Sequence, residues 1–453
     1  MPKKLPPIPP LKALNFRKAL SIPGLLKTVR KKFSGIEEHR ETKPTYSLPD
    51  VLMSGLAIFQ LKYTSLLAFD DVRDEPRIRN NLHQLYGVEK APCDTQLRTV
   101  LDPVEPDALR PAIVSVIQDV QRHGDLESFR YLGGFLISMD GTGEFSSNHI
   151  SCPDCMEKKH RSGETEYYHQ LLAAAIVHPD KKTVLPLFSE AIEKQDGNSK
   201  NDCERNAGKR LLPALGKAFP RLKIIILEDA LAGNGPHIDT LTEQGFSYII
   251  RAKTGSNESL MDEAQKRIIA GEADEFERFD EAAEVTRGYR FVNDLPLNKE
   301  HPEIRVNYLD YRETDKEGNE KNFVWLTDIT LSRDNAYHVM RAGRARWKVE
   351  NETFNTLKNL GYNFEHNYGH GKENLATVLA NLMMLAFLLD QVQENSCNLF
   401  QAARHRFHAR TSLWEKIRGI FTEHYIDDWK TFYMAIIFGH IGDKLVPNYP
   451  DTS

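Results

Sequence analysis

The middle of the chain alternates between short apolar runs and segments with helical spacing. The apolar runs are rich in β-branched or aromatic residues and predict strands over 131–140, 167–178, 223–229 and 246–251. Between them, residues 202–215 and 236–244 have the pattern of helices. Strands that alternate with helices predict an α/β fold with a mixed sheet, flanked by helices, in which some neighbouring strands run parallel.

A different pattern interrupts this alternation over residues 254–332. Its acidic part begins near Glu272. Strand-like alternation of apolar and polar residues follows over 285–292, 304–311 and 322–331. We therefore expect a mainly β insertion within the α/β part of the chain.

Helical patterns dominate the rest of the sequence. Residues 46–125 have the pattern of several short helices. Another helical pattern begins at Asp334, which could cap it, and runs to Gly361, which could end it. The most apolar segment, 376–389, is too short to span a bilayer and contains Asn381. It predicts a buried helix, and we expect no membrane association.

The distribution of charge matters more here than the total. The net charge of −5 argues against a general nucleic-acid binder, because phosphate contacts need Lys and Arg. Residues 1–45 are nevertheless basic and proline-containing. Arg251 and Lys253 lie two residues apart at the end of a predicted strand. A second basic cluster follows the insertion and comprises Arg341, Arg344, Arg346, Lys348 and Lys358. We expect these side chains to contact DNA phosphates.

Three acids are the strongest candidates for chemistry. Asp140, within SMDGTG, and Asp229, within LEDALAGNGP, end two predicted strands, where open α/β sheets bind ligands. Glu350 lies in the helical stretch RARWKVENETFNTLKN. Two Mg²⁺ ions about 3.5–4 Å apart, held by carboxylates, can activate a water or a 3′-hydroxyl for attack on a phosphodiester. We expect these acids to hold two Mg²⁺ ions, for which Mn²⁺ can substitute.

The chain has five cysteines, an odd number that gives no disulfide framework and indicates a reducing, cytoplasmic compartment. Cys152 and Cys155 form a single CxxC pair, which could bind zinc together with Cys203 and either His160 or His169. The alternative is reduced cysteines in a loop.

His366 and His370 are four residues apart. On a helix they would share a face and could bind a metal. In a loop they would pack or contact DNA.

Four blocks together make the sequence resemble the DDE transposases of bacterial insertion sequences. They are MDGTG, EDALAGNGP, IIRAK and RWKVENETFNTLKNLGYNFEHNYGHG, and they lie within residues 130–390. The branch resembled carries a β insertion before the catalytic glutamate. The resemblance implies a ribonuclease H-like core, metal-dependent hydrolysis at transposon ends and transfer of the 3′-hydroxyl into target DNA. It also implies a homodimer on double-stranded DNA, in a bacterial, nucleoid-associated setting.

The resemblance assigns the three metal-binding acids to Asp140, Asp229 and Glu350, with Glu352 as the alternative to Glu350. The family's arginine four residues before the glutamate is present as Arg346. Two positions depart from the family. Gly343 stands where a tyrosine is usual, and Lys358 lies eight rather than seven residues after Glu350.

Pattern and resemblance together divide the chain into six parts. These are a basic arm (1–45), a helical DNA-binding domain (46–125), the first part of the ribonuclease H-like core (126–253), the β insertion (254–332), the rest of the core (333–390) and a helical C-terminal region (391–453). A structure-selective nuclease would use the same acids, and a degenerate DNA-binding protein would bind DNA without cleaving it.

Overall fold

The computed structural model describes residues 14–41, 44–194, 200–407, 409–441 and 446–447. Its centre is a mixed sheet in which three strands run antiparallel and two more are added in parallel, in the order β5–β4–β2–β6–β7. The strands are β2 (Gly134–Ser147), β4 (Thr165–Val177), β5 (Leu185–Ile192), β6 (Ile224–Glu228) and β7 (Ser247–Ala252). This is the ribonuclease H-like arrangement that the resemblance implied. Two short strands, β1 (Arg130–Tyr131) and β3 (Met156–Lys159), pair at its margins.

Strand β2 is longer than the sequence predicted. It continues through Asp140 to Ser147, whereas its parallel partner β6 stops at Glu228, and the last β2–β6 pair is Ser138 with Leu227. The expectation that Asp140 ends a strand was therefore wrong. The β2 backbone runs on because β4 remains paired with it as far as Ser147.

The insertion extends the central sheet instead of forming a separate one. Its helix α9 (Glu258–Ile269) is followed by an antiparallel meander whose last strand pairs with β7. The meander comprises β8 (Asp274–Asp280), β9 (Val285–Pro296), β10 (Arg305–Asp315) and β11 (Glu320–Thr327). The sequence predicted neither α9 nor the acidic, mostly exposed strand β8.

Helices cover both faces of the sheet. Side chains alternate between the two faces along a strand. Gly141 of β2 lies against Glu204 of α7 (Lys200–Ala218), beside α8 (Gly235–Glu243), whereas Ser138 donates to the Arg346 carbonyl beyond α10 (Ala336–Ala345). Odd and even positions of β2 therefore face different helical layers.

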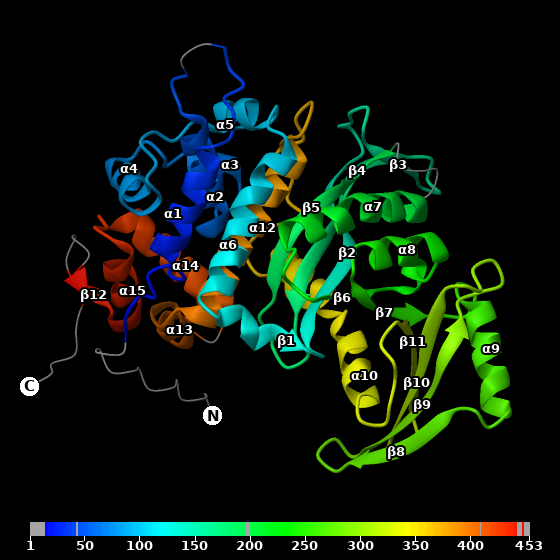
Figure 1. Ribbon diagram of the computed structural model, residues 1–453. Coiled ribbons are helices and arrows are strands. Elements are labelled where there is room, and N and C mark those ends of the chain that lie inside the picture. The colour runs from blue at the N-terminus through cyan, green and yellow to red at the C-terminus, as the bar shows by residue number, and fades with distance from the viewer. Residues whose placement is uncertain (1–13, 42–43, 195–199, 408, 442–445, 448–453) are drawn as a thin grey trace, which may run out of the picture.

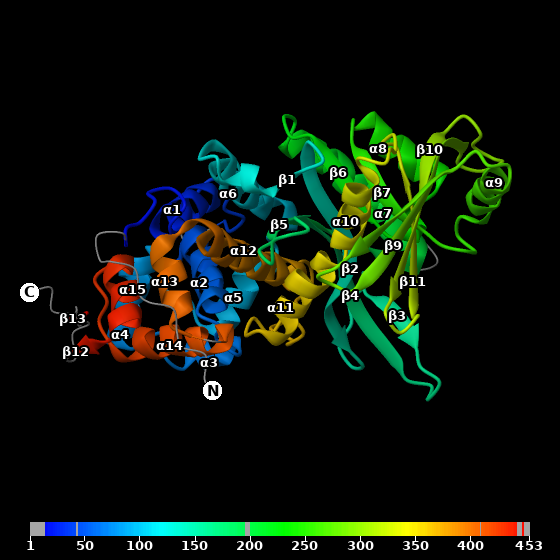
Figure 2. The same cartoon turned by 90° about the horizontal axis from the view of Figure 1, so that it is seen from below.

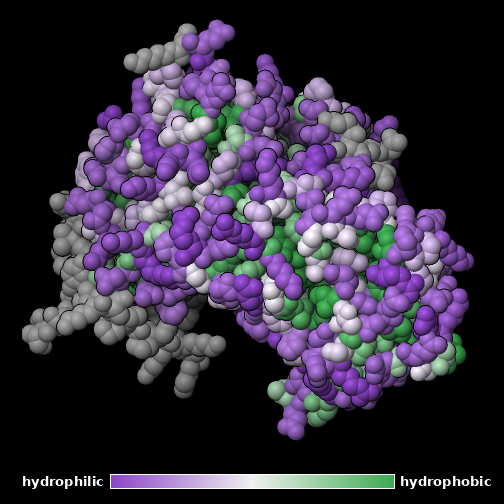
Figure 3. Space-filling model, viewed as in Figure 1, coloured by the Kyte–Doolittle hydropathy of each residue, from purple (hydrophilic) through white to green (hydrophobic). Residues whose placement is uncertain are grey.

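Both ends of the chain build one helical body beside the sheet (Figures 1 and 2). The N-terminal helices are α1 (Ile22–Phe33), α2 (Leu48–Gln60), α3 (Leu66–Asp70), α4 (Pro76–Asn81), α5 (Asp94–Leu101) and α6 (Arg110–Arg122). The C-terminal ones are α12 (Leu375–Ser396), α13 (Asn398–His405), α14 (Arg410–Glu423) and α15 (Trp429–Phe438). Hydrophilic residues cover most of the face in Figure 3, as expected for a body whose apolar side chains are packed inside.

Within the helical body, helix α12 contacts both α2 and the sheet strand β5 (Figures 1 and 2). By length and composition it could cross a membrane, but 94% of its most apolar window is buried inside the protein. A core helix of a folded domain has the same properties. Residues 376–389 thus form the buried helix that the sequence predicted.

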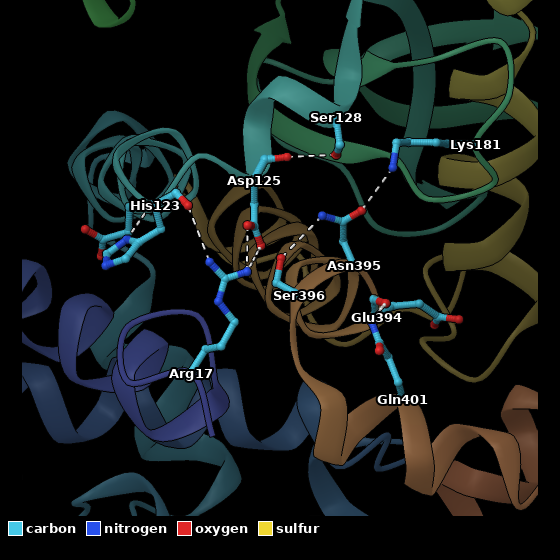
Figure 4. Close-up of polar contacts among 10 residues, drawn as sticks. Arg17, His123, Asp125, Ser128, Lys181, Glu394, Asn395, Ser396 and Gln401 are labelled. Carbon is cyan, nitrogen blue, oxygen red and sulfur yellow. Dashed lines mark hydrogen bonds and ion pairs between the residues drawn. The ribbon is translucent and has the colours of Figure 1, made fainter. Parts of the chain in front are cut away.

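The junction near the start of the sheet is held by polar contacts (Figure 4). Arg17 donates to both carboxylate oxygens of Asp125 at 2.6 Å, and Lys181, between β4 and β5, donates to Asn395 of α12 at 3.3 Å. Part of the expected N-terminal arm is therefore folded: α1 buries Ile22 and Phe33 with its other apolar side chains. Residues 1–13 lie outside the described residues.

Candidate active site

Asp140 and Glu350 meet through one arginine. Arg346 donates one nitrogen to Asp140 Oδ2 at 3.0 Å and another to Glu350 Oε1 at 2.8 Å. Its side chain is 9% exposed, compared with 29% for Asp140 and 35% for Glu350. The guanidinium is therefore buried against the two carboxylates, which keep an open side toward solvent.

Asp229 lies beside this pair. Asp140 lies two positions after Ser138, and Asp229 lies two positions after Leu227, the partner of Ser138, so the parallel register of β2 and β6 brings the two aspartates to the same level. Both line one small cavity of about 60 Å³ between the sheet and α7. One Asp229 oxygen accepts from the Leu231 backbone at 2.9 Å, which caps a short 3₁₀ turn (Ala230–Ala232) and fixes the carboxylate.

The charge at Asp140 is only partly compensated. Burial, and after it the neighbouring Glu350 carboxyl, raise the pKa of Asp140 to about 7 against the opposing effect of Arg346. Two acids that share one guanidinium in a partly buried place attract further positive charge. The arrangement can therefore bind a cation through oxygen ligands.

Two features of the same cavity have no signal in the sequence. Glu204 of α7 lies against Gly141, where a Cβ atom would come within 2.8 Å of its carboxylate. His237 of α8 contacts the buried Glu228 at 2.7 Å. Burial alone would lower the pKa of His237, but the Glu228 carboxylate outweighs it and holds that pKa above its ordinary value. The Glu228 carboxylate is therefore held by His237, and Asp229 next to it lines the same cavity.

The helix expected from Asp334 to Gly361 is interrupted at the glutamate. Helix α10 ends at Ala345, a π-helical segment η7 spans Val349–Phe354, and α11 spans Asn355–Asn359. A π-helical turn holds more residues than an α-helical one and is frequent at functional sites. It accounts for the spacing of Lys358, because the wider turn takes up the one extra residue after Glu350.

Glu350 rather than Glu352 lies beside Asp140. Arg346 donates a hydrogen bond to Glu350, and the Glu350 carboxyl raises the pKa of Asp140. Glu352 instead lies near enough to Lys348 to act on the pKa of that lysine. The geometry therefore favours Glu350 as the third acid.

Gly343 leaves room for the indole of Trp325, which is buried in β11. A Cβ atom at Gly343 would lie 2.5 Å from Cε2 of that ring, so the usual tyrosine of the family cannot fit. Trp325 is 2% exposed and stacks on Phe323 with ring centroids 5.7 Å apart. Glycine thus stands at position 343 because the Trp325 ring of the insertion fills the space beside α10 that a larger side chain would need.

Because of this packing, we expect Gly343→Ala to change the stability in the direction opposite to that usual for Gly→Ala in a helix. Gly→Ala within a helix ordinarily stabilises by about 0.5–1 kcal/mol, but Gly343→Ala should destabilise by about 1–3 kcal/mol through overpacking. Gly419→Ala in α14, where a Cβ would meet nothing within 4 Å, is the matched control. Thermal denaturation should lower the Tm of the first variant and leave that of the second unchanged or higher. A Tm for Gly343→Ala at or above the wild-type value would contradict the account.

The expected DNA-contacting residues divide into groups. Arg341, Arg344 and Lys348 follow one another at intervals of three and four residues and line an open cavity of about 480 Å³ with Arg287. Arg341 also pairs with Asp180 at its rim, and Arg344 lies 3.1 Å from Glu313.

The remaining expected contacts lie apart from this cavity. Arg346 is engaged by the two acids, Lys358 pairs with Glu365 at 2.9 Å, and Lys253 is exposed. Burial lowers the pKa of Arg251, and the nearby charge of Arg346 lowers it further. The Arg251 guanidinium lies over the Phe323 ring, and its buried Nε has no hydrogen-bond partner among the described residues.

The cysteine pair lies beside one histidine that the sequence offered as a partner, His169, and one that it did not, His370. His169 and His370 join Cys152 and Cys155 in one cluster, whereas His160 contacts Glu166. The side chain of Cys203 lies outside the described part of the structure.

The sequence allows His366 and His370, four residues apart, to bind a metal together if they lie on a helix. Residues 366–371 form a loop rather than a helix, and His366 packs edge-on against Tyr368. His366 and His370 therefore do not share a helical face.

Comparisons with known proteins place this geometry in a family. The family profile "Transposase DDE domain" matches residues 139–389, which include all three acids. The structure of a piggyBac transposase synaptic complex with hairpin DNA aligns with a TM-score of 0.42 and 12% identity, over 98% of this chain and 89% of that chain. A search of curated protein sequences gives no match. Because the family match spans more than half of the 453 residues, this chain belongs to the transposase DDE domain family, whose enzymes cleave DNA and transfer its strands with divalent metal ions.

Proposed function

We propose that Asp140, Asp229 and Glu350 are the metal-binding acids of this transposase. The observation that carries the proposal is the pair of carboxylates held on either side of Arg346, with Asp229 beside them on the neighbouring strand. The acids come from the central sheet and from the segment after the insertion, so the folded core is needed to assemble them.

The residues present fit hard divalent cations. All three ligand side chains are carboxylates, the donors that Mg²⁺ prefers, and the guanidinium of Arg346 already lies where positive charge is favoured. Two Mg²⁺ ions, or Mn²⁺ in their place, would supply an activated oxygen nucleophile and stabilise the leaving oxygen of the phosphodiester.

The protein's own groups organise this site. Arg346 positions Glu350 relative to Asp140 through its two hydrogen bonds, and the cap at Leu231 fixes Asp229. The contact between His237 and Glu228 at 2.7 Å engages an additional carboxylate beside the site. We expect Arg251, at the end of β7 and near Arg346, to contact a phosphate of the bound strand.

We place part of the DNA path across the cavity beside α10. Arg287, Arg341, Arg344 and Lys348 outnumber its two acids, Asp180 and Asp280. Excess positive charge in a hollow attracts phosphates and makes affinity dependent on salt.

The combined variant Arg344→Ala/Lys348→Ala should bind DNA more weakly at every sequence. If each side chain neutralises one phosphate, the slope of log affinity against log salt should fall by about 1.8. Fluorescence anisotropy with a labelled duplex across a salt series measures this slope. Lys266→Ala/Lys316→Ala removes the same charge from exposed lysines, 74% and 68% exposed, on α9 and the β10–β11 turn. Equal slopes for the two combined variants would exclude the cavity from the DNA path.

We infer that the substrate is double-stranded DNA at the ends of a bacterial insertion sequence, joined to target DNA by a homodimer. The proposal places the protein in the cytoplasm and, when bound to DNA, on the nucleoid. The family membership and the sequence blocks around the three acids support this reading.

The test is a cleavage and joining assay on DNA that flanks the coding sequence on both sides. With Mg²⁺ or Mn²⁺ we expect free 3′-hydroxyl ends and their covalent joining to a second duplex, and neither product with EDTA. Cleavage without joining would replace the proposal with a metal-dependent nuclease. Binding without cleavage under either metal would leave only a DNA-binding protein.

A further inference from the structure

A second cluster of ligand-type side chains lies outside the acidic site. It comprises Cys152 and Cys155 in the loop between β2 and β3, His169 of β4, and His370 in the loop after α11. Their sulfur and nitrogen atoms all lie within 4.8 Å of one another. Cys155 and His370 are 1% and 8% exposed, so the cluster lies mostly inside the protein.

The separations match the edges of one tetrahedron. Zinc bonds of about 2.3 Å to sulfur and 2.0–2.1 Å to nitrogen imply about 3.8 Å between two sulfurs, about 3.6 Å between sulfur and nitrogen, and about 3.3 Å between two nitrogens. The observed S–S distance is 3.7 Å, and the N–N distance between His169 and His370 is 3.1 Å. Three S–N distances are 3.4, 3.2 and 3.3 Å.

The surroundings orient these ligands. His370 places its Nδ1 2.9 Å from the Gly371 carbonyl, so a proton there leaves Nε2 free to face the cluster. The Cys152 backbone N–H donates to Cys155 Sγ at 3.3 Å, which holds the CxxC turn closed. The Phe145 ring packs against His370 with centroids 4.5 Å apart and shields one side.

We propose that these four side chains bind one structural Zn²⁺ ion. Four protein ligands complete its tetrahedral coordination and leave no position for a substrate. On binding, the two thiols release their protons, and two thiolates with two neutral imidazoles balance the charge of the ion. Sulfur and nitrogen donors select zinc, whereas the carboxylates of the other site select Mg²⁺, so each site takes a different metal.

The position of the ion suggests its role. Cys152 and Cys155 follow the strand that carries Asp140, and His370 follows the segment that carries Glu350. The zinc therefore ties together two parts of the chain, 215 residues apart, that each hold one acid of the active site. It stabilises the separation between those acids.

The first experiment measures metal in the full-length protein purified without chelator. Elemental analysis should find about one zinc per wild-type chain, and the same in Asp140→Ala and in Cys93→Ser, a partly buried cysteine outside the cluster. Cys155→Ser and His370→Ala should contain less than about a tenth of that amount. Because these variants could fail to fold, a second measurement uses wild-type protein alone.

In that measurement Co²⁺ replaces the zinc. Two thiolates on a tetrahedral site should give a thiolate-to-cobalt charge-transfer band and intense d–d bands, which the acidic site cannot produce. Wild type and Asp140→Ala should show identical spectra. A wild-type protein without zinc that also lacks these bands after Co²⁺ addition would overturn the proposal, as would full zinc content in a folded Cys155→Ser variant.

Discussion

Replacing Asp140, Asp229 or Glu350 by alanine should lower the rate of metal-dependent DNA cleavage on the order of 10³-fold or more, beyond the 10–100-fold typical of losing an outer-shell partner. Each variant removes one oxygen ligand from a site in which the carboxylates share the charge of the bound cations. Single-turnover cleavage of DNA with the element's ends, in Mg²⁺, measures the loss. Binding of the uncut duplex should persist, because the basic residues beside α10 remain.

Glu352→Ala is the matched control, because it removes a carboxylate two residues away on the same π-helical segment. It should cleave within a few-fold of wild type. If Glu352→Ala were inactive and Glu350→Ala active, the assignment on this segment would be wrong although the reaction would stand. If all four variants cleaved like wild type, the site would lie elsewhere.

The largest expected loss of stability is at Lys62. Its ammonium donates to Asp390 at 2.6 Å, and both side chains are almost fully buried, with 2% and 5% exposed. It also lies 4.2 Å from the ring centres of Tyr362 and Trp414. Lys62→Met should lower the free energy of unfolding by about 3–5 kcal/mol, because the Asp390 charge would remain buried without its partner.

Chemical denaturation followed by circular dichroism measures this effect. Lys316→Ala breaks an exposed pair with Glu284, 68% and 63% exposed, and should leave the midpoint nearly unchanged. Asp390→Asn should also destabilise, since it leaves the ammonium of Lys62 buried with less compensation. A Lys62→Met midpoint equal to that of Lys316→Ala would show that the buried pair contributes little.

The sequence predicted the parts of the fold that rest on strong local patterns. Alternation and β-branched residues located β2, β4, β6, β7 and the strands β9–β11. Strand β8 was not predicted, because its exposed, acidic residues give the strand no apolar face. The π-helical turn at Glu350 was also not predicted, because a shift in backbone hydrogen bonding leaves no periodic signal that a short segment can carry.

The candidate acids could be named from sequence, but their surroundings could not. Asp140 and Asp229 follow apolar runs, which is a local signal. The bridge through Arg346, the approach of Glu204 and the arrival of His370 beside Cys155 depend on contacts between distant segments. The spacing of the cysteines alone left their partners open.

The construction of the helical body from both ends of the chain bears on biosynthesis. Asn81 donates to the carbonyls of Phe421 and His424, and the Trp429 indole donates to that of Leu85. A ribosome releases the N-terminal helices long before these partners exist. Until nearly the whole polypeptide has emerged, the apolar faces of the N-terminal helices remain uncovered and accessible to chaperones. A message truncated after the catalytic segment would therefore yield a chain that cannot complete this body, so that only full-length translation produces a stable transposase.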